Sequence, residues 1–536
     1  MSKYFEEPEA TIYHGNCLEE LKDLADNSVD AIVTDPPYGL GDSDPDYILN
    51  ALKMWISGDR SHIPAGKGFM GKKWDSFVPP PAVWDECYRV LKPGGHILVF
   101  AGTRTQDLMC LSVRMAGFEI RDSIAWIYAQ GFPKSLDISK AIDKMAGAER
   151  EVIGTAGNAP DLRDVGAKSK EIIGIDKLSF GQVQNAERTE VLITAPATDD
   201  AKKWSGWGTA VKPALEPIIV GRKPLSEKNV ALNVLKWGTG GINIDESRIG
   251  FTSENDIAQY DFNQNGQNRS TKEDGESLEV YDGGWKVQKG EKEIPSGRFP
   301  SNVIFSHADG CTPTGEIITS KTVAGNRTAT FGTQETISGG DGSGGFDGYE
   351  YQIEVYACVD GCPVKELDEQ SGITTSGKPR ADRGTGGIWK EGNGIPAGQQ
   401  HGDKGGASRF FFVAKASKKD RNEGLVDVPE KGKVYNGKSE ESAGNAPGSV
   451  EDKFTTKPQA NHHPTVKPTS LMEYLIKLIT PAGGIVLDPF AGSGSTGKAA
   501  VRNDFKFIGV EITGEYLPIL KGRVEHEITE KRNSLF

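Results

Sequence analysis

Four consecutive residues have the side-chain types needed to bind and activate an amino group on an aromatic ring: Asp35, Pro36, Pro37 and Tyr38. The Asp35 carboxylate and the Pro36 carbonyl oxygen can each accept a hydrogen bond from one N–H of an exocyclic amine. Neither proline has a backbone N–H that would compete for these acceptors, and Tyr38 offers a flat face for stacking. Such acceptors localise the nitrogen lone pair, which could then attack a sulfonium methyl group directly.

The position of this tetrapeptide suits a ligand site. It follows the apolar run 31–33, which we expect to end a buried strand, and α/β sheets bind ligands beyond the carboxyl ends of their strands. An adenine amino group would fit the chemistry once its base has been flipped out of the duplex. The alternative without a ligand is an ordinary proline-rich turn.

A glycine-rich loop near the C-terminus is the second candidate site. Three glycines lie between an expected strand, residues 484–487, and an expected helix that starts at Thr496: Gly492, Gly494 and Gly497. Backbone N–H groups and the positive end of the helix would favour a polar ligand there. A tight turn without a ligand is a disfavoured alternative, because turn geometry alone does not require three glycines at this spacing.

Two known ligand loops compete as interpretations of these glycines. Gly492, Gly497 and Lys498 have P-loop spacing, but Ala499 stands where a P-loop has the Ser or Thr that binds magnesium. The glycines also match a dinucleotide-binding loop, in which Glu511 would bind ribose hydroxyl groups. The same carboxylate would suit the ribose of S-adenosylmethionine, so the loop alone leaves NAD and S-adenosylmethionine open.

Taken together, these motifs resemble those of the amino-group DNA methyltransferases, the N6-adenine or N4-cytosine type, of the order called beta. In that order the catalytic tetrapeptide precedes the target-recognition region and the cofactor loop comes last, as Asp35 precedes Gly492 here. The resemblance extends to residues 16–30, 91–95, 463–468 and 488–494. It covers about residues 1–230 and 462–536, and the islands 298–307 and 409–421 resemble phage and prophage members of the family.

The resemblance implies an α/β fold: a Rossmann-like, S-adenosylmethionine-dependent methyltransferase core with a doubly wound sheet and a long loop-rich insert. The expected domains are a catalytic half at residues 10–228, a target-recognition insert at 229–460 and a cofactor-binding half at 461–530. The catalytic residues would be Asp35, Pro36, Pro37 and Tyr38. The cofactor-binding residues would be Asn16, Thr465, Lys467, Asp488, Phe490, Gly492, Gly494 and Glu511.

The resemblance also implies a role for each residue of the cofactor site. Phe490 and the loop glycines would line the S-adenosylmethionine pocket, and Glu511 would hold the ribose. Thr465 and Lys467 would contact the methionine end of the cofactor. Asp488 would orient either the loop or the cofactor's amino group.

Two positions bear on how closely the chain follows the family. Family members commonly have Asp where this chain has Asn16, whose side chain could still bond the cofactor adenine as a donor or an acceptor. Asp35 favours adenine, because cytosine-N4 enzymes more often begin the tetrapeptide with serine, and related protein and RNA methyltransferases with asparagine. We therefore predict N6-adenine methylation, with N4-cytosine methylation and an inactive DNA-binding accessory protein as alternatives.

The expected partners are double-stranded DNA and S-adenosylmethionine, in a restriction-modification setting in the cytoplasm, with a homodimer and a cognate restriction nuclease as further candidates. Six cysteines among 536 residues are too few for a disulfide scaffold, and residues 1–9 lack the apolar core of a signal peptide. No apolar run approaches the roughly 20 residues that span a bilayer, so we expect no membrane partner.

The net charge constrains how DNA could be bound. Lys and Arg number 62 against 75 Asp and Glu, a net charge of −13, which excludes a protein that coats nucleic acid by charge alone. Within residues 201–240 seven basic and two acidic residues accompany Trp204, Trp207 and Trp237, a mixture that suits phosphate and base contacts. The alternative is that these tryptophans are core residues. The basic run 415–421 is a second candidate for phosphate contacts.

The insert contains three of the chain's six cysteines, and together with a histidine they have the spacing of metal ligands: His307-x3-Cys311 and Cys358-x3-Cys362. A glycine precedes the last cysteine of each pair, and four such ligands suit a tetrahedral structural zinc. A loop-rich segment with little core would gain stability from such a metal. Free thiols beside a hydrogen-bonded histidine are the alternative.

Hydrophobic periodicity predicts the elements that position these residues. We expect strands at residues 29–34, 96–100, 120–128, 216–221, 484–487 and 507–510, and helices at 18–24, 81–91, 470–479 and from 496. Residues 92–95 should turn, and Ser470 with Glu473 should form a capping box. In the insert we expect strands at 302–305, 351–356 and 409–414, and glycine-rich loops at 339–348 and 371–408.

Overall fold

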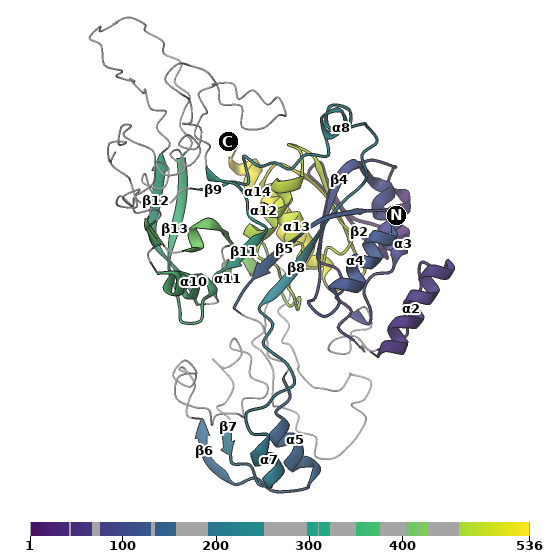
Figure 1. Cartoon of the computed structure of the whole chain (residues 1–536). Coiled ribbons are helices and arrows are strands. Elements are labelled where there is room, and N and C mark those ends of the chain that lie inside the picture. Colours follow the sequence, from purple (N-terminus) through teal and green to yellow (C-terminus); the bar gives the residue numbers. More distant parts are fainter. Residues whose placement is uncertain are drawn as a thin grey trace, which may run out of the picture. The chain divides into compact units, whose positions relative to one another are not determined.

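The computed structural model describes residues 2–41, 44–66, 75–129, 135–156, 191–250, 297–308, 310–321, 350–372, 374–375, 404–405, 407–414, 418–426, 428 and 460–534. The chain divides into two compact units (Figure 1). The first unit contains Met1–Asn243, Asn302–Asp309 and Ala414–Phe536, and the second contains Ile244–Ser301 and Gly310–Val413. The N-terminal and C-terminal parts of the chain therefore fold together.

The largest sheet has the strand order β1-β2-β18-β17-β3-β4-β8-β5-β11-β16, and its strands from β1 to β11 in this order belong to the first unit. The bounds are β1 (Lys3–Glu7), β2 (Ala10–His14), β3 (Val29–Thr34), β4 (Leu91–Phe100), β5 (Glu119–Ile127), β8 (Leu215–Arg222), β11 (Val303–Ser306), β16 (Phe412–Ala414), β17 (Ile485–Asp488) and β18 (Lys506–Glu511). The five neighbouring strands β2, β18, β17, β3 and β4 are parallel to one another. Strand β8 is antiparallel to both β4 and β5.

The strand order reverses at the pair β3–β17. Strand β3 lies between β4, which follows it along the chain, and β17, which comes from the C-terminal part. In doubly wound sheets, ligands bind outside the carboxyl ends of the strands at such a switch point. Both sequence motifs lie there, since the tetrapeptide follows β3 and the glycine loop follows β17.

Burial on both faces explains why these strands are almost wholly apolar. Successive side chains of β3 point to opposite faces, so Ile32 belongs to one core cluster while Ala31 and Val33 are buried on the other face. The predicted α/β core with a doubly wound sheet is thus confirmed.

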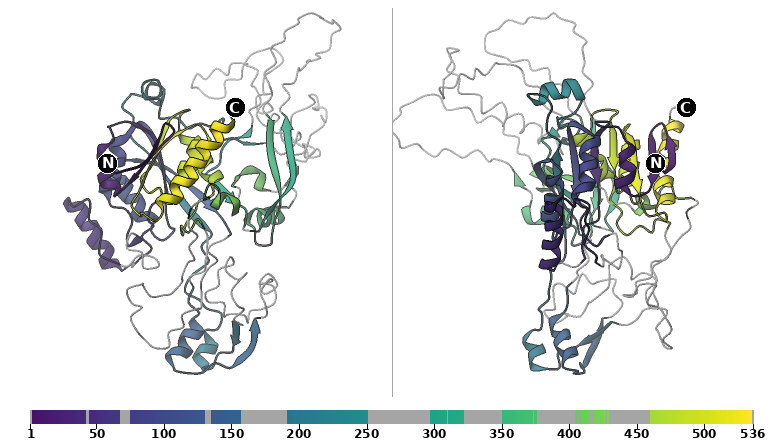
Figure 2. Two further views of the ribbon diagram at one scale, coloured as in Figure 1. Left: turned by 180° about the vertical axis from the view of Figure 1, so that it is seen from behind. Right: turned by 90° about the vertical axis from the view of Figure 1, so that its right-hand side faces the viewer.

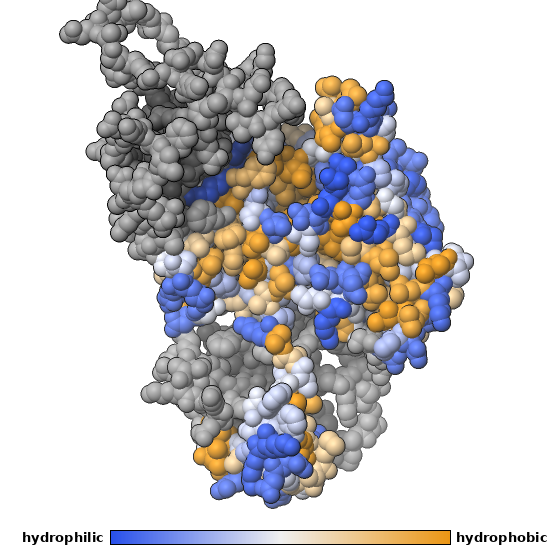
Figure 3. Space-filling model, viewed as in Figure 1, coloured by the Kyte–Doolittle hydropathy of each residue, from blue (hydrophilic) through white to orange (hydrophobic). Residues whose placement is uncertain are grey.

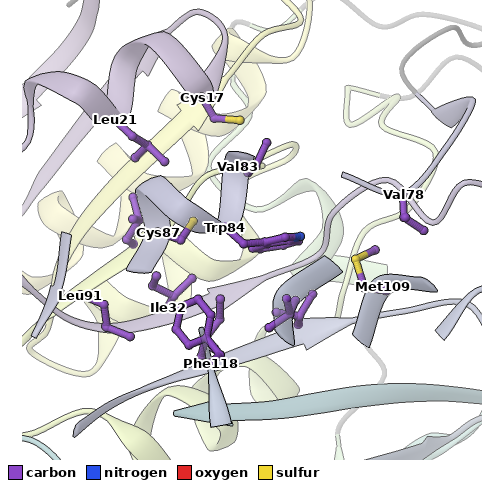
Figure 4. Packing of buried hydrophobic residues seen from close by; sticks show 14 of the residues in the cluster. Cys17, Leu21, Ile32, Val78, Val83, Trp84, Cys87, Leu91, Met109 and Phe118 are labelled. Carbon is purple, nitrogen blue, oxygen red and sulfur yellow. The ribbon is translucent and has the colours of Figure 1, made fainter. Parts of the chain in front are cut away.

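Helices cover both faces of this sheet (Figure 2). On one face α3 (Pro81–Val90) packs against α1 (Cys17–Glu20), the 3-10 helix η1 (Leu21–Asp23) and α4 (Gln106–Met115). Figure 4 shows the core beneath them, where Trp84 is fully buried beside Ile32. On the other face α13 (Ser495–Arg502) packs against α12 (Thr469–Ile479) and α14 (Leu517–Ser534), which comes to the front in the left view of Figure 2.

The first unit contains further elements besides these layers. They are α2 (Pro45–Ser57), α8 (Val230–Trp237), α11 (Lys418–Asn422) and, between β5 and β8 in the chain, α5 (Ile138–Met145), β6 (Val152–Ala156), β7 (Val191–Thr194) and α7 (Asp199–Lys203). Helix α8 exposes several apolar side chains, including Leu232 and Leu235, and Figure 3 shows orange beside blue at its position. Among the described residues, no helix combines the length and the apolar character needed to span a bilayer.

Two local predictions were wrong. Residues 92–95 were expected to form a turn, but they belong to the continuous strand β4 and bulge out of its ladder with β3, where the pairing jumps from Val29–Leu91 to Ala31–His96. Ser470 does not begin a helix, because α12 starts at Thr469. The Asp420 carboxylate instead accepts hydrogen bonds from Thr469 N at 2.9 Å and Thr469 Oγ1 at 2.6 Å.

The second unit consists of short paired elements. They are β9 (Ile249–Gly250) with β10 (Gly297–Arg298), β12 (Thr312–Lys321) with β13 (Glu350–Ala357), β14 (Thr374–Thr375) with β15 (Lys404–Gly405), α10 (Pro363–Ser371) and the 3-10 helix η4 (Ala407–Phe410). The expected strand 351–356 lies within β13. Of the expected strand at 409–414, residues 409–410 belong to η4 and residues 412–414 form β16. The loop 339–348 and most of the loop 371–408 lie outside the described residues.

Candidate active site

The tetrapeptide leaves β3 at the switch point and turns sharply. Gly39, the residue after Tyr38, has φ +65°, and a Cβ atom there would lie 2.5 Å from Val78 N. Only glycine fits this turn without displacing backbone. The turn keeps Asp35 and Tyr38 close, with the Tyr38 hydroxyl donating a hydrogen bond to Asp35 Oδ1 at 2.8 Å.

A second carboxylate reaches the same hydroxyl group from the antiparallel strand β8. Tyr38 OH lies 2.8 Å from Glu216 Oε2 as well as from Asp35 Oδ1. Because the hydroxyl has one hydrogen, it can serve only one of these carboxylates at a time. Burial, followed by the charges of Asp35 and Glu216, raises the pKa of Tyr38 well above its ordinary value, so the hydroxyl remains a donor.

The ammonium group of Lys467 is the counter-ion of both carboxylates. Its Nζ lies 2.6 Å from Asp35 Oδ2 and 3.3 Å from Glu216 Oε2, and the side chain is buried. Three aromatic rings surround the ammonium group, with centroids at 5.4 Å for Tyr38, 5.0 Å for Phe100 and 5.9 Å for Trp126. This cluster of Asp35, Tyr38, Glu216 and Lys467, which we call the acidic cluster, carries one positive and two negative formal charges.

Opposing effects set the ionisation of this cluster. Burial raises the pKa of Asp35, Lys467 lowers it, and Glu216 raises it, with a net increase from the ordinary value. Burial disfavours the charge on Lys467, but Asp35 and Glu216 outweigh burial and raise the pKa of that ammonium group. Lys467 is therefore a permanent cation that favours the ionised form of Asp35.

The glycine loop is fixed by a third acid, Asp488, at the end of β17. Its Oδ1 accepts hydrogen bonds from Thr34 Oγ1 at 2.7 Å and Phe490 N at 3.1 Å, and its Oδ2 accepts one from Thr496 Oγ1 at 2.6 Å. These donors come from β3, from the loop itself and from α13, so Asp488 joins the three segments around the switch point. Burial raises the pKa of Asp488 to about 6 despite these hydrogen bonds.

The loop glycines adopt left-handed conformations, with φ +51° at Gly492 and +79° at Gly494. A Cβ at Gly494 would lie 2.6 Å from Leu520 Cδ1, so close packing against α14 also demands glycine. Gly492 N donates a hydrogen bond to Glu511 Oε2 at 2.8 Å, and Thr513 N donates one to Glu511 Oε1 at 2.7 Å. Two backbone donors thus hold the Glu511 carboxylate at the end of β18.

Lys498 is fully buried and has protein partners, which argues against a P-loop. Its ammonium group lies 2.6 Å from Asp420 Oδ1 and 2.8 Å from Glu423 Oε2. A P-loop lysine must reach a phosphate group, whereas this lysine points toward α11. Gly497 lies inside α13 where a Cβ would be 2.6 Å from Phe507 Cε1, so it serves helix–strand packing.

The other predicted cofactor residues lie at the edges of this region. Asn16 caps α1, since its side chain accepts a hydrogen bond from Leu18 N at 3.0 Å. Phe490 is half-buried, with its ring centroid 6.3 Å from that of Trp84. Thr465 is exposed, and its carbonyl oxygen lies 2.9 Å from His463 Nδ1. The sequence predicted that Lys467 contacts the methionine end of the cofactor. In the structure its ammonium group lies beside the Asp35 carboxylate.

Sequence reasoning missed Glu216 and Asp420 as site residues. Glu216 was predicted within a strand but not assigned a role, although an acid near the start of an otherwise apolar strand is an unusual feature. Asp420 was treated as part of a basic run, but it binds Lys498 and caps α12. Lys415 of that run lies outside the described residues.

The predicted DNA-contact stretch splits into exposed and internal residues. Trp204 is 37% exposed and Trp207 is 58% exposed, so the core interpretation of these two tryptophans was wrong. Lys223 is buried and donates hydrogen bonds to the carbonyl oxygens of Tyr88 and Leu91, which makes it a structural residue.

The four predicted metal ligands are brought together. One ring nitrogen of His307 and the thiol sulfurs of Cys311, Cys358 and Cys362 all lie within 4.8 Å of one another. The thiols are not joined by disulfide bonds. Burial raises the pKa of the Cys311 and Cys358 thiols, and the neighbouring thiol of Cys362 raises both further.

Comparison with known proteins places these motifs in a family. The model of a DNA methylase family, the N6/N4 type, matches residues 29–147 and 365–522, just over half of the chain. These ranges contain the tetrapeptide, Lys467 and the whole glycine loop.

Curated relatives match over short stretches. The Type II methyltransferase M2.DpnII of Streptococcus pneumoniae is 47% identical over 68 residues, which is 13% of this chain and 25% of that protein. The DNA adenine methyltransferase YhdJ of Escherichia coli is 50% identical over 56 residues, 10% of this chain and 19% of that protein. The Type II methyltransferase M.HpaI of Haemophilus parainfluenzae is 31% identical over 130 residues, 24% of this chain and 35% of that protein. The matches thus span about a fifth to a third of these relatives.

Solved structures show weaker likeness. A DNA modification methylase of Thermus thermophilus aligns with a TM-score of 0.29 at 13% identity, covering 96% of this chain and 95% of that one. The cytosine-N4-specific PvuII DNA methyltransferase aligns with a TM-score of 0.33 at 11% identity, covering 100% of this chain and 95% of that one. The sequence match to the family model extends over most of the switch-point residues described above, and this chain belongs to the N6/N4 DNA methylase family.

Proposed function

We propose that this protein transfers a methyl group from S-adenosylmethionine to the N6 amino group of adenine in double-stranded DNA. The observation that carries the proposal is the acidic cluster at the switch point, with Asp35 of the tetrapeptide next to the Asp488 loop. Family membership supports methylation of an amino group in DNA.

The acidic cluster suits a reaction that develops positive charge on nitrogen. The two carboxylates and one ammonium group leave a formal charge of −1 in buried surroundings, where electrostatic interactions are strong. An amine nitrogen that accepts a methyl group becomes cationic in the transition state. Asp35 and the Pro36 carbonyl would orient the amine, Tyr38 would stack on the base, and Lys467 would keep Asp35 ionised.

The region around the glycine loop fits S-adenosylmethionine better than a pyrophosphate cofactor. Lys498 is committed to Asp420 and Glu423, so it is not available for a phosphate group. Gly492 and Gly494 would let the backbone approach the ligand, Phe490 would contact it, and Glu511 would accept from its ribose. The cofactor would supply the methyl group as a sulfonium ion, and the net negative charge nearby favours such a cation.

The choice of adenine rests on Asp35 and on the relatives. Aspartate begins the tetrapeptide, and YhdJ, which is 50% identical over 56 residues, bears the name of a DNA adenine methyltransferase. The family also contains N4-cytosine enzymes, so N4-cytosine methylation is the second candidate. A homodimer, a cognate restriction nuclease and a phage origin stay predictions.

Methyl transfer from labelled S-adenosylmethionine to duplex DNA tests the proposal. The wild-type protein should label DNA, and Asp35→Ala should lower labelling by a factor of about 10² or more, the range seen when an aligned charge-stabilising group is lost. Glu530→Ala, which removes an exposed carboxylate on α14, is the control and should leave labelling unchanged.

Three outcomes separate the alternatives. Modified bases identified by mass spectrometry after digestion distinguish N6-methyladenine from N4-methylcytosine. Thermal stabilisation by S-adenosylhomocysteine supports the cofactor assignment, whereas stabilisation by NAD alone would contradict it. A wild-type protein that binds DNA but labels no DNA of any sequence would indicate an accessory protein.

A further inference from the structure

We infer that His307, Cys311, Cys358 and Cys362 bind one structural zinc ion. This site is not part of the proposed methyl-transfer chemistry, and the inference does not depend on that function. Four potential ligand atoms converge, and their types are the ones that zinc prefers, three thiol sulfurs and one imidazole nitrogen.

The spacing of the ligand atoms matches a tetrahedral site. All four atoms lie within 4.8 Å of one another. With Zn–S bonds of about 2.3 Å, two sulfurs on a tetrahedral zinc ion lie about 3.8 Å apart, so small adjustments would complete the coordination. Soft thiolate ligands select zinc over magnesium or calcium, which prefer oxygen.

Backbone pairing explains why the cysteines meet. Cys311 immediately precedes β12 and Cys358 immediately follows β13. The antiparallel register pairs Thr312 with Ala357, so the neighbouring cysteines are held at the same end of the hairpin. Cys362 follows after one turn and occupies the N-cap position of α10. The site therefore lies where the hairpin and α10 join.

The two turns that carry ligands share the same local design. The sequence Asp-Gly-Cys occurs at residues 309–311 and again at 360–362. Both glycines have left-handed conformations, with φ +105° at Gly310 and +75° at Gly361. A Cβ at Gly310 would lie 3.3 Å from Val359 Cγ1, so the two turns also pack closely. Repeated left-handed turns just before a cysteine direct both thiols to one point.

Burial indicates a structural rather than a catalytic metal. His307, Cys311 and Cys362 are buried and Cys358 is half-buried, and four protein ligands leave no position for a substrate. The described part of the second unit has few buried apolar side chains, so zinc coordination would provide stability that a small core cannot.

The other group of potential ligands does not qualify. Glu423, His526 and Glu527 also approach one another, but Lys498 and Arg502 already form ion pairs with both carboxylates. Two cations at this place would repel a metal ion.

The test is the zinc content of the full-length protein, purified without chelators from zinc-containing medium and measured by mass spectrometry. Wild-type protein should contain about one equivalent of zinc per chain, and Cys358→Ser or Cys362→Ser should lower this to under about a tenth. Cys110→Ser, which changes a half-buried thiol outside the cluster, is the matched control and should keep the full equivalent.

X-ray absorption on the wild-type protein keeps the inference testable if a cysteine variant fails to fold. The zinc shell should contain three sulfurs at about 2.3 Å and one nitrogen at about 2.0–2.1 Å. The inference is overturned by wild-type protein with under about a tenth of an equivalent of zinc, by a shell of oxygen and nitrogen alone, or by iron with inorganic sulfide. Unchanged zinc content in both cysteine variants would also overturn it.

Discussion

Two aspartates, the half-buried Asp35 and the buried Asp488, lie at the carboxyl ends of neighbouring strands and have different partners. Asp35 follows β3 and lies 2.6 Å from the ammonium group of Lys467. Asp488 ends β17 and accepts hydrogen bonds from the hydroxyl groups of Thr34 and Thr496 and from Phe490 N. Asp35 therefore has a counter-ion. The hydrogen-bond donors to Asp488 within the described part of the chain are all neutral.

We propose that this difference separates a carboxylate that takes part in the chemistry from one that fixes the backbone of the loop. At Asp488 the hydrogen bonds from neutral donors lower the pKa less than burial raises it, so the pKa rises to about 6. At Asp35 burial also outweighs the other effects and raises the pKa, but there the charge of Lys467 opposes burial. A carboxylate that stabilises a developing cation must remain ionised in the dry site, whereas one that orients a loop needs mainly its acceptor geometry.

Removing the counter-ion of Asp35 should have the largest effect on the stability of the protein. Lys467→Met leaves Asp35 and Glu216, each only 18% exposed, without a cation, which should lower the free energy of unfolding by about 3–5 kcal/mol. Urea denaturation at neutral pH measures the loss. Lys236→Met removes an exposed ion pair with Glu227 as the control, and its cost should stay below about 1 kcal/mol. Equal losses in the two variants would contradict a special role for Lys467.

The raised pKa of Asp488 should appear as a pH dependence of stability. The unfolded carboxyl titrates near 3.8 and the folded one at about 6, so the folded state binds the proton more tightly between these values. Stability from this group therefore increases as the pH falls through 6 and is complete below 3.8. Relative to Asp488→Asn, the wild type should gain about 2 kcal/mol between pH 7 and about pH 4.5.

Denaturation of both proteins across this pH range measures the gain. The Asn variant serves as its own control, because every other titrating group is shared. A stability difference that stays constant with pH, or that grows as the pH rises, would show that neutral donors lower the pKa of Asp488 as effectively as a cation would.

Much of this arrangement follows from the sequence, and the reasons are local. The tetrapeptide comes directly after an apolar strand, and the glycine loop lies between a strand and a helix, so short-range patterns were enough to place Asp35 and Asp488 at strand ends. Alternation between strand and helix patterns also predicted the α/β class.

The partners of these residues could not be predicted, because they come from distant parts of the chain. Glu216 reaches the acidic cluster only because β8 inserts antiparallel between β4 and β5, an order that local patterns do not reveal. The cap of α12 was assigned to Ser470, since nothing in the local sequence indicates that Asp420, 49 residues earlier than Thr469, supplies the carboxylate. Tertiary contacts replaced the expected local ones at both places.

The two oxygens of Asp488 should respond unequally to the loss of a donor. Thr496→Val leaves Oδ2 without the one hydrogen bond described for it, and should cost about 1–3 kcal/mol of stability. Thr34→Val should cost less, because Oδ1 keeps the Phe490 N–H at 3.1 Å and valine suits a buried strand. Thermal or urea denaturation ranks the two variants. A larger loss for Thr34→Val would contradict the assignment of donors to the two oxygens.

The smallest effect on stability is expected for the second carboxylate of the acidic cluster. Glu216→Gln keeps the shape and an acceptor for Tyr38 but removes a negative charge that raises the pKa of Asp35. Stability should change by less than about 1 kcal/mol, because the lost attraction to Lys467 is offset by relief of the repulsion between the carboxylates. The acidic limb of the pH profile of methyl transfer should move to lower pH, since Asp35 would ionise more readily. If Glu216 instead only fixes Tyr38 in place, the variant should change the rate at every pH equally and leave the limb where it is.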